Sequence, residues 1–179
     1  MSHFLQTAGG RAYDLEDDPD PSAIQIEEIA FALAHINRFL GHAGAYSVAQ
    51  HSVLAMRAAE MAGLSPGVCA AATMHDAHEA LTGDCPTPIK RILGDAWRAF
   101  ERRHEIAIRR RFGICLMMPS SVVSIDLRML VTERRDLLGG VEARSWGIDA
   151  EPFEFRIVRW SPETARREFL AACEKYGIR

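Results

Sequence analysis

Histidine and carboxylate side chains in the middle of the chain have the types and the spacing of a metal site. His75 and Asp76 are adjacent, and Glu79 follows Asp76 by three residues. Residues three apart share one face of a helix, so Asp76 and Glu79 could point into the same space with His75 beside them. A histidine and a carboxylate suit a borderline or hard divalent cation, and Glu79 is placed to act on a water bound to that cation. The alternative is that His75 and Asp76 form a hydrogen bond within a helical core.

Two further residues could complete the site from other helices. His51 lies on the preceding predicted helix, and Asp126 interrupts the apolar face of a later one, so that its carboxylate could point inward. An inward carboxylate needs a cation or a hydrogen-bond donor, because the burial of an unpaired charge costs too much free energy. Two histidines and two aspartates would satisfy one metal ion and leave positions for water and a substrate.

The segment from His75 to Lys90 carries a more specific signal than the His-Asp pair alone. It reads HDAHEALTGDCPTPIK and resembles the HD-x-x-E-x-x-T-G-D-x-P-T-P-x-K stretch of the HD-domain 5′-deoxynucleotidases. Over residues 29–138, the chain resembles the wider class of HD-domain metal-dependent phosphohydrolases, including small phage-type dATP/dNTP triphosphohydrolases. The resemblance implies one divalent transition metal per active site (Mn, Fe, Co, Ni or Zn), with four ligands in this order: His51, His75, Asp76 and Asp126.

The resemblance also implies roles for other residues. Glu79 would be the general acid/base that handles the proton of the attacking water or of the leaving oxygen, and Asp84 would reach the sugar or the leaving 5′ oxygen. Substrate contacts would come from Arg38, Phe39, His42, Thr82, Pro86 and Lys90. Arg38-Phe39 occupies the place of an Arg-aromatic pair that grips phosphate and sugar. This aromatic is typically Trp in the deoxynucleotidases, so Phe39 puts strict selection of deoxyribose over ribose in question.

Several of these residues also have simpler interpretations. Arg38 could be a helix-end cation that contributes a few tenths of a kcal/mol. Lys90 could be a solvated loop residue. His78 is more simply explained as an exposed or hydrogen-bonded residue of a helix than as a metal ligand. His35 and His104 are predicted to be surface residues of helices.

These features predict an enzyme that releases phosphate from deoxyribonucleoside 5′-monophosphates, because the Thr-Gly-Asp loop matches that class so well. The alternative is a small dNTP triphosphohydrolase of the dATP type, which would release triphosphate and use an additional Mg. A more remote alternative is a nucleotide- or nucleic-acid-binding HD module without turnover. The six arginines between Arg98 and Arg111 are scattered over several helix faces, which favours a solvated face or an oligomer contact over nucleic-acid binding. The resemblance implies a homo-oligomer, at least a dimer.

The composition limits the remaining classes. The chain has 179 residues, of which 48% are hydrophobic, and a formal net charge of −3. At ~150 residues per domain, this length predicts one domain over residues 1–179. The charge excludes a protein held to nucleic acid by bulk positive charge. No secretory signal or good membrane span is recognised, so we expect a cytoplasmic protein without a membrane partner. Small buried or inert thiols, rather than disulfides, are predicted for Cys69, Cys85, Cys115 and Cys173.

Helices must position the candidate site residues. The HD-domain resemblance and the apolar periodicity together predict an all-α bundle of about six helices. Their approximate ranges are 29–40, 47–62, 65–81, 95–112, 119–138 and 161–176. The loop over 82–88 contains two prolines and a glycine and is expected to be rigid and non-helical. Extended segments near the two ends of the chain, at 10–15 and 153–157, could form a short β-ribbon.

Overall fold

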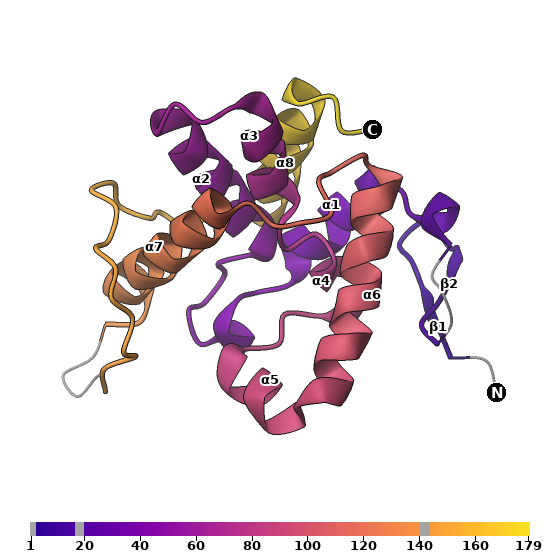
Figure 1. Ribbon diagram of the computed structural model, residues 1–179, viewed down its shortest axis with the longest axis horizontal. Coiled ribbons are helices and arrows are strands. Elements are labelled where there is room, and N and C mark those ends of the chain that lie inside the picture. Colours follow the sequence, from indigo (N-terminus) through magenta and orange to yellow (C-terminus); the bar gives the residue numbers. More distant parts are fainter. Residues whose placement is uncertain (1–2, 17–19, 140–143) are drawn as a thin grey trace.

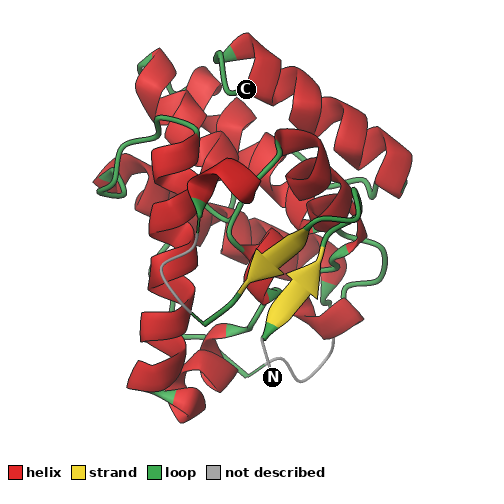
Figure 2. Cartoon of the chain, turned by 90° about the vertical axis from the view of Figure 1, so that its right-hand side faces the viewer, coloured by secondary structure: helices red, strands yellow, loops and turns green. Residues whose placement is uncertain are grey.

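Most of the described chain is helical, as the sequence predicts, and it contains one small antiparallel sheet. The computed structural model describes residues 3–16, 20–139 and 144–179. Its helices are α1 (Ile26–His35), α2 (Val48–Met61), α3 (Pro66–Met74), α4 (Glu79–Thr82), α5 (Thr87–Leu93), α6 (Asp95–Arg111), α7 (Ser120–Leu137) and α8 (Pro162–Lys175). Strands β1 (Phe4–Gln6) and β2 (Ala12–Asp14) form a hairpin on the outside of the helices (Figure 2), with Leu5 opposite Tyr13. No helix within these ranges has the length and apolar character of a membrane span.

The α2 helix is central to the packing, because it contacts α1, α3, α7 and α8. Its first turn forms at Ser47, whose hydroxyl oxygen accepts a hydrogen bond from the Gln50 amide at 3.2 Å and so caps the helix. Both α2 and α3 bury small side chains, including Ala55, Ala59 and Ala71, which lets the two helices approach closely. In Figure 1, α6 and α7 extend on opposite sides of this packed region.

The alanine-rich helix predicted over 65–81 is interrupted where the candidate ligands lie. α3 ends at Met74, residues 75–78 form turns, and α4 begins at Glu79. Backbone hydrogen bonds in this stretch reach back three residues rather than four, from Ala77 N to Met74 O at 3.2 Å and from Glu79 N to Asp76 O at 3.0 Å. This tighter geometry differs from that of an α-helix. The prediction of one continuous helix was therefore wrong.

The helix predicted over 29–40 also ends early, at His35, because the following backbone pairs elsewhere. Ile36 O accepts from Val48 N at 3.0 Å, and Arg38 N donates to Tyr46 O at 2.9 Å. These bonds fix the ends of a loop that leads from α1 into α2. Within that loop, Phe39 and Leu40 have φ values of 56° and 53°, which are strained for residues that carry a side chain.

The proline-rich loop is shorter than predicted. α4 ends at Thr82, and α5 begins at Thr87 with Pro88 in its first turn. Proline fits there because its missing amide hydrogen would have no helical partner in the first turn. The expectation of a non-helical segment therefore holds only for residues 83–86.

The second predicted β-segment, at 153–157, is not a strand, and β1 and β2 both come from the N-terminal part of the chain. Side chains of α7 bind the backbone of this segment instead. The Arg135 guanidinium donates to the carbonyls of Phe153 and Phe155, both at 2.7 Å, and the Asp136 carboxylate accepts from the amide of Ile157 at 2.9 Å. Because these backbone groups are already satisfied, the segment does not need a neighbouring strand.

Candidate metal centre

The structure brings the predicted metal ligands together from three parts of the chain. His51 comes from α2, His75 and Asp76 from the turns after α3, and Asp126 from α7. The Nε2 atoms of His51 and His75 are 3.0 Å apart, and Oδ1 of Asp126 lies 3.2 Å from the first and 3.8 Å from the second. Oδ2 of Asp76 lies 3.5 Å and 3.2 Å from the same nitrogens. The donor atoms of His51, His75 and Asp126 lie close enough together to hold one metal ion, and Asp76 lies beside the two histidines.

In both histidines the Nδ1 atom has a hydrogen-bond partner outside the cluster, and this determines the protonation of the Nε2 atom that faces the cluster. Nδ1 of His75 lies 2.8 Å from the carbonyl of Ala72, and Nδ1 of His51 lies 2.5 Å from Oε1 of Glu133. A carbonyl or an ionised carboxylate only accepts, so both Nδ1 atoms must donate, and in the neutral rings both Nε2 lone pairs face the cluster. Four acceptors then meet in a small volume, so positive charge is required among them, from a proton or a metal ion.

The pKa values of the two histidines respond to this concentration of negative charge. Burial alone would lower the pKa of His75, but the Asp76 and Asp126 carboxylates outweigh it and raise the pKa well above its ordinary value. For His51, burial and Arg38 act downward, and Glu133 and Asp126 more than offset them. The cluster therefore attracts a cation strongly.

Glu133 is a residue of the site that the sequence interpretation missed. It lies on α7 seven positions after Asp126, is 0% exposed, and accepts hydrogen bonds from His51, Tyr46 and Arg38. Burial would raise its pKa, but Arg38 and His51 more than offset this and lower it. The seven-residue spacing, two helical turns, was a signal that could have placed Glu133 on the same face as Asp126.

The predicted general acid/base lies beside these ligands in a protected position. Glu79 is 3% exposed, and its Oε2 atom is buried without a hydrogen-bond partner in the described part of the chain. Burial raises the pKa of Glu79 well above its ordinary value, and the nearby Asp76 and Asp84 carboxylates raise it further. Glu79 is therefore able to hold a proton that an ordinary glutamate would lose.

Arg38 joins the same network rather than standing free at a helix end. It is 8% exposed, and its guanidinium pairs with Glu133 at 3.1 Å and with Asp76 at 3.2 Å. Its Cζ lies 5.5 Å from the centre of the Phe39 ring, which in turn lies 6.1 Å from the ring of Trp146. Trp146 is a second aromatic residue at this place that the sequence interpretation did not include.

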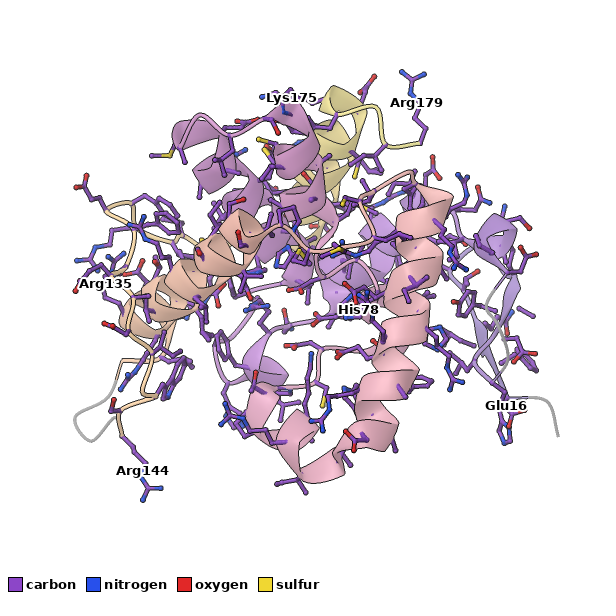
Figure 3. The ribbon with its side chains drawn as sticks, viewed as in Figure 1. Glu16, His78, Arg135, Arg144, Lys175 and Arg179 are labelled. Atoms are coloured by element: carbon purple, nitrogen blue, oxygen red, sulfur yellow. The ribbon has the colours of Figure 1, made fainter. Side chains whose placement is uncertain are left out.

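The structure pairs Lys90 and His78 with one acidic residue of α6. Lys90 pairs with Glu101 of α6 at 2.6 Å, and the same carboxylate lies 3.4 Å from Nε2 of His78, which is buried beside α6 (Figure 3). Lys90 and His78 are therefore not free surface residues. Asp84 is partly buried, and burial raises its pKa.

The remaining predicted substrate contacts are Thr82, Pro86 and His42. Thr82 is partly buried at the end of α4, where its hydroxyl donates to the carbonyl of His78 at 3.3 Å. Pro86 precedes α5 directly. His42 is exposed after the Phe39–Gly41 turn, and it does not line the cavity beside the ligand cluster.

A cavity of about 570 Å³ opens beside the ligand cluster. Its lining includes His75, Asp76 and Asp126 from the cluster, the cations Lys90, Arg98 and Arg102, the acids Glu101 and Glu105, and the apolar Met118, Val122 and Val123. A polar wall from α5 and α6 thus faces an apolar wall from α7 and the segment before it. Such a mixture suits a ligand with both a charged and an apolar part.

Some surface predictions were wrong. His104 is 0% exposed, and its Nδ1 atom lies 2.9 Å from the hydroxyl of Tyr13. Arg109, predicted among the solvated or oligomer-contacting arginines, is 1% exposed and pairs with Glu105 at 2.9 Å. For His104 and Arg109, tertiary packing overrides what the local sequence suggests. All four cysteines are free thiols, as predicted; Cys69 and Cys173 are buried, and Cys115 is exposed.

Comparison with known proteins places the chain among relatives. No family model matches it. The chain is 40% identical over 173 residues to the uncharacterized protein YfdR of Escherichia coli K12, and the match covers 93% of this chain and 92% of YfdR. It is also 38% identical over 154 residues to an uncharacterized protein of Rhodobacter capsulatus, covering 80% of this chain and 77% of that one. The chain therefore belongs to the same protein family as YfdR.

Proposed function

We propose that the protein is an HD-domain phosphohydrolase that uses one divalent metal ion to release phosphate from deoxyribonucleoside 5′-monophosphates. The observation that carries this proposal is the convergence of His51, His75, Asp76 and Asp126, with nitrogen–nitrogen and nitrogen–oxygen separations between 3.0 and 3.8 Å. Imidazole and carboxylate ligands together are compatible with Mn, Fe, Co, Ni and Zn. The resemblance of residues 75–90 to the deoxynucleotidase motif supports the substrate class.

The chemistry needs a bound cation, a proton donor and groups that hold the substrate. The cation would polarise a phosphoryl oxygen and lower the pKa of a water molecule at the site. The raised pKa of buried Glu79 would favour its protonated form, which could deliver a proton to the leaving 5′ oxygen. Asp84, at the end of the Thr-Gly-Asp loop, would contact the sugar.

Positive side chains would hold the phosphate. The bonds from Arg38 to Glu133 and Asp76 use three of its N–H groups, so the five-donor guanidinium keeps donors for a phosphate oxygen. Lys90 can add a second cationic contact, because it lines the cavity and Glu101 keeps it charged. The apolar wall of Met118, Val122 and Val123 would take the base.

A second candidate is a dNTP triphosphohydrolase, with an additional Mg for the triphosphate. The observation in its favour is that Arg98 and Arg102 of α6 also line the cavity, in addition to Lys90 of α5. These cations could contact phosphates beyond the first one. Each already has an acidic neighbour on the same helix, Asp95 for Arg98 and Glu105 for Arg102, which weakens this argument.

A nucleotide-by-metal activity panel on chelator-treated protein tests both candidates. The panel pairs each dNMP, NMP and dNTP with Mn²⁺, Fe²⁺, Co²⁺, Ni²⁺ and Zn²⁺, and it measures phosphate, pyrophosphate and triphosphate separately. We expect phosphate from dNMPs in the presence of at least one transition metal and none after chelation. Triphosphate from dNTPs would overturn the monophosphate proposal in favour of the second candidate. Binding of nucleotides without any product would overturn both.

A further inference from the structure

Glu133 is a fully buried charged residue that contacts both the ligand cluster and Arg38. We infer that Glu133 is a positioning residue, whose carboxylate fixes the nitrogen that His51 presents to the metal and holds Arg38 against Asp76. This inference rests on the proposed metal-dependent function and adds a residue that lies outside both the ligand set and the sequence motif.

One carboxylate oxygen of Glu133 acts on the His51 ring. Oε1 accepts from Nδ1 of His51 at 2.5 Å and from the Tyr46 hydroxyl at 2.9 Å. The proton must therefore stay on Nδ1, and the Nε2 lone pair must face the cluster. A carboxylate in this position fixes the tautomer and orientation of a ligating histidine and makes it a stronger base.

The other carboxylate oxygen acts on Arg38. Oε2 accepts from Nε at 3.3 Å and from Nη2 at 3.1 Å, while Nη1 of the same guanidinium donates to Oδ2 of Asp76 at 3.2 Å. That Asp76 oxygen lies 3.2 Å from Nε2 of His75. Glu133 therefore reaches two candidate ligands, His51 directly and Asp76 through Arg38.

Stability alone gives a poor account of this arrangement. Replacing a buried ion pair with well-packed apolar residues is often neutral or stabilising, so packing does not require a charge at position 133. The four hydrogen bonds to Glu133 come from three side chains, and each of these borders or belongs to the candidate site. The geometry instead matches that of carboxylates that hydrogen-bond to metal ligands and fix the orientation of those ligands.

The test is Glu133→Gln, which keeps the shape of the side chain but replaces one oxygen with an NH₂ group. Arg38 can only donate, so the amide oxygen should face Arg38 and the NH₂ should face His51. Nδ1 of His51 must then accept, which places the proton on Nε2 and blocks the metal position. We expect the Zn²⁺ affinity of chelator-stripped protein to fall about 10–100-fold in calorimetric titration, with an unchanged circular dichroism spectrum.

Tyr46→Phe is the matched control. It removes one hydrogen bond from the same Glu133 oxygen but leaves the carboxylate and the proton on Nδ1 of His51 in place. We expect its Zn²⁺ affinity to stay within about 3-fold of the wild type, well short of the loss typical of an outer-shell change. A loss as large as that of Glu133→Gln would show that general packing at this position, and not the His51 tautomer, controls metal affinity, and would overturn the inference.

The outcomes separate the inference from the proposed function. Wild-type protein that does not bind Zn²⁺ would refute the metal centre and, with it, the positioning role. Wild-type binding together with an unchanged affinity in Glu133→Gln would overturn the positioning role alone. If the variant does not fold, ¹⁵N NMR of the Zn²⁺-loaded wild type decides: the inference requires a protonated Nδ1 and a ligating Nε2 in His51, and the reverse arrangement contradicts it.

Discussion

Two neighbouring carboxyl groups of the site have pKa values that are shifted in opposite directions. Burial would raise the pKa of Asp76, but His75 and His51 lower it well below the usual range, so this group stays ionised. For Glu79, burial and the Asp76 carboxylate outweigh the opposing effect of Arg38 and Lys90 and raise the pKa. Carboxyl groups that are separated in this way are suited to different tasks, one as a metal ligand and the other as an acid.

The replacement Glu79→Gln tests this division of roles. The amide keeps the shape of the side chain but cannot deliver a proton, so we expect kcat to fall about 10²–10⁴-fold. Zn²⁺ affinity should change little, because Glu79 is not a ligand. Steady-state kinetics and calorimetric titration on the same preparation measure the two effects. Glu154→Gln, at an exposed position outside the site, is the control and should keep full activity. Full activity in Glu79→Gln would refute the acid role.

At the level of single residues, the sequence predicts the candidate metal ligands better than it predicts the buried residues that contact them. The ligands carry their own signal, because histidine and aspartate at apolar or motif positions are unusual. Glu133 lies in the charged run Glu133-Arg134-Arg135-Asp136, where only its seven-residue spacing from Asp126 distinguishes it from its charged neighbours. Its partners Arg38 and Tyr46 are about 90 residues away in sequence. His104 is similar, since its partner Tyr13 is on a distant strand.

At the scale of elements, the helices were predicted well and their interruptions were not. Apolar periodicity locates α2, α6, α7 and α8 to within a few residues. It does not show the turns at 75–78, because alanine favours a helix and the departure comes from side-chain contacts such as that of His75 with Ala72. The wrong prediction of a strand at 153–157 also arises from contacts between residues that are distant in sequence. Its alternating pattern reflects packing on α7 rather than pairing with a strand.

Arg135 and Asp136 of α7 bind residues 153–157, and we call these contacts the clamp. The clamp should contribute measurably to the free energy of unfolding. Asp136 binds Arg135, Arg156 at 2.7 Å and the Ile157 amide at 2.9 Å, and its side chain is 4% exposed. We expect Asp136→Asn to lower the free energy of unfolding by about 2 kcal/mol, the size of a hydrogen bond to a charged group. Urea unfolding at pH 7 measures this change. Asp95→Asn, whose side chain is 95% exposed, should change it by less than about 0.5 kcal/mol; equal losses in both variants would contradict the clamp.

The same clamp has a defined pH dependence. Hydrogen bonds from Arg135 lower the pKa of Asp136 well below 3.8, and the opposing effect of burial is smaller. Because the pKa of Asp136 is lower in the folded protein than in the unfolded chain, its carboxylate stabilises the folded protein above about pH 3.8. This contribution is lost as the pH falls from about 3.8 through the pKa that Asp136 has in the folded protein. The difference between wild type and Asp136→Asn should therefore shrink at low pH.

The contact between α6 and the β-hairpin should show a different pH window. Burial lowers the pKa of His104 from 6.5 to about 4, and Arg103 and His78 add to the effect. Between these values the unfolded chain binds a proton that the folded protein does not, so stability is lost as the pH falls from 6.5 towards 4. His104→Gln should flatten this slope in urea unfolding, whereas His35→Gln, at an exposed position, should not. An unchanged slope in His104→Gln would mean that His104 is protonated in the folded protein.

For the molecule as a whole, a net charge of −3 is compatible with an anionic substrate. The relevant charge is local, because interactions with solvent-exposed charges beyond about 10 Å are largely screened at moderate salt. Arg38 is charged although it is buried, since Glu133 and Asp76 outweigh the cost of burial and raise its pKa. A divalent cation beside it would, together with Arg38, balance the carboxylates of Asp76, Asp126 and Glu133, so the site itself would not repel an anionic substrate.

The metal should also hold the molecule together, because its ligands come from α2, the turns after α3, and α7. Without a metal ion, a proton on a histidine must supply the positive charge that holds the carboxylates beside the two rings. A metal that binds only the folded state adds RT ln(1 + [M]/Kd), which at 100 times Kd is about 2.7 kcal/mol and corresponds to a rise in Tm of about 5–10 °C for a chain of this size. We expect this rise when Zn²⁺ is added to chelator-stripped protein in differential scanning calorimetry. The rise should disappear in Asp126→Asn and persist in Asp95→Asn, because Asp126 is a proposed ligand and Asp95 lies on the exposed end of α6. An equal rise in Asp126→Asn would show that Zn²⁺ stabilises the protein from another place.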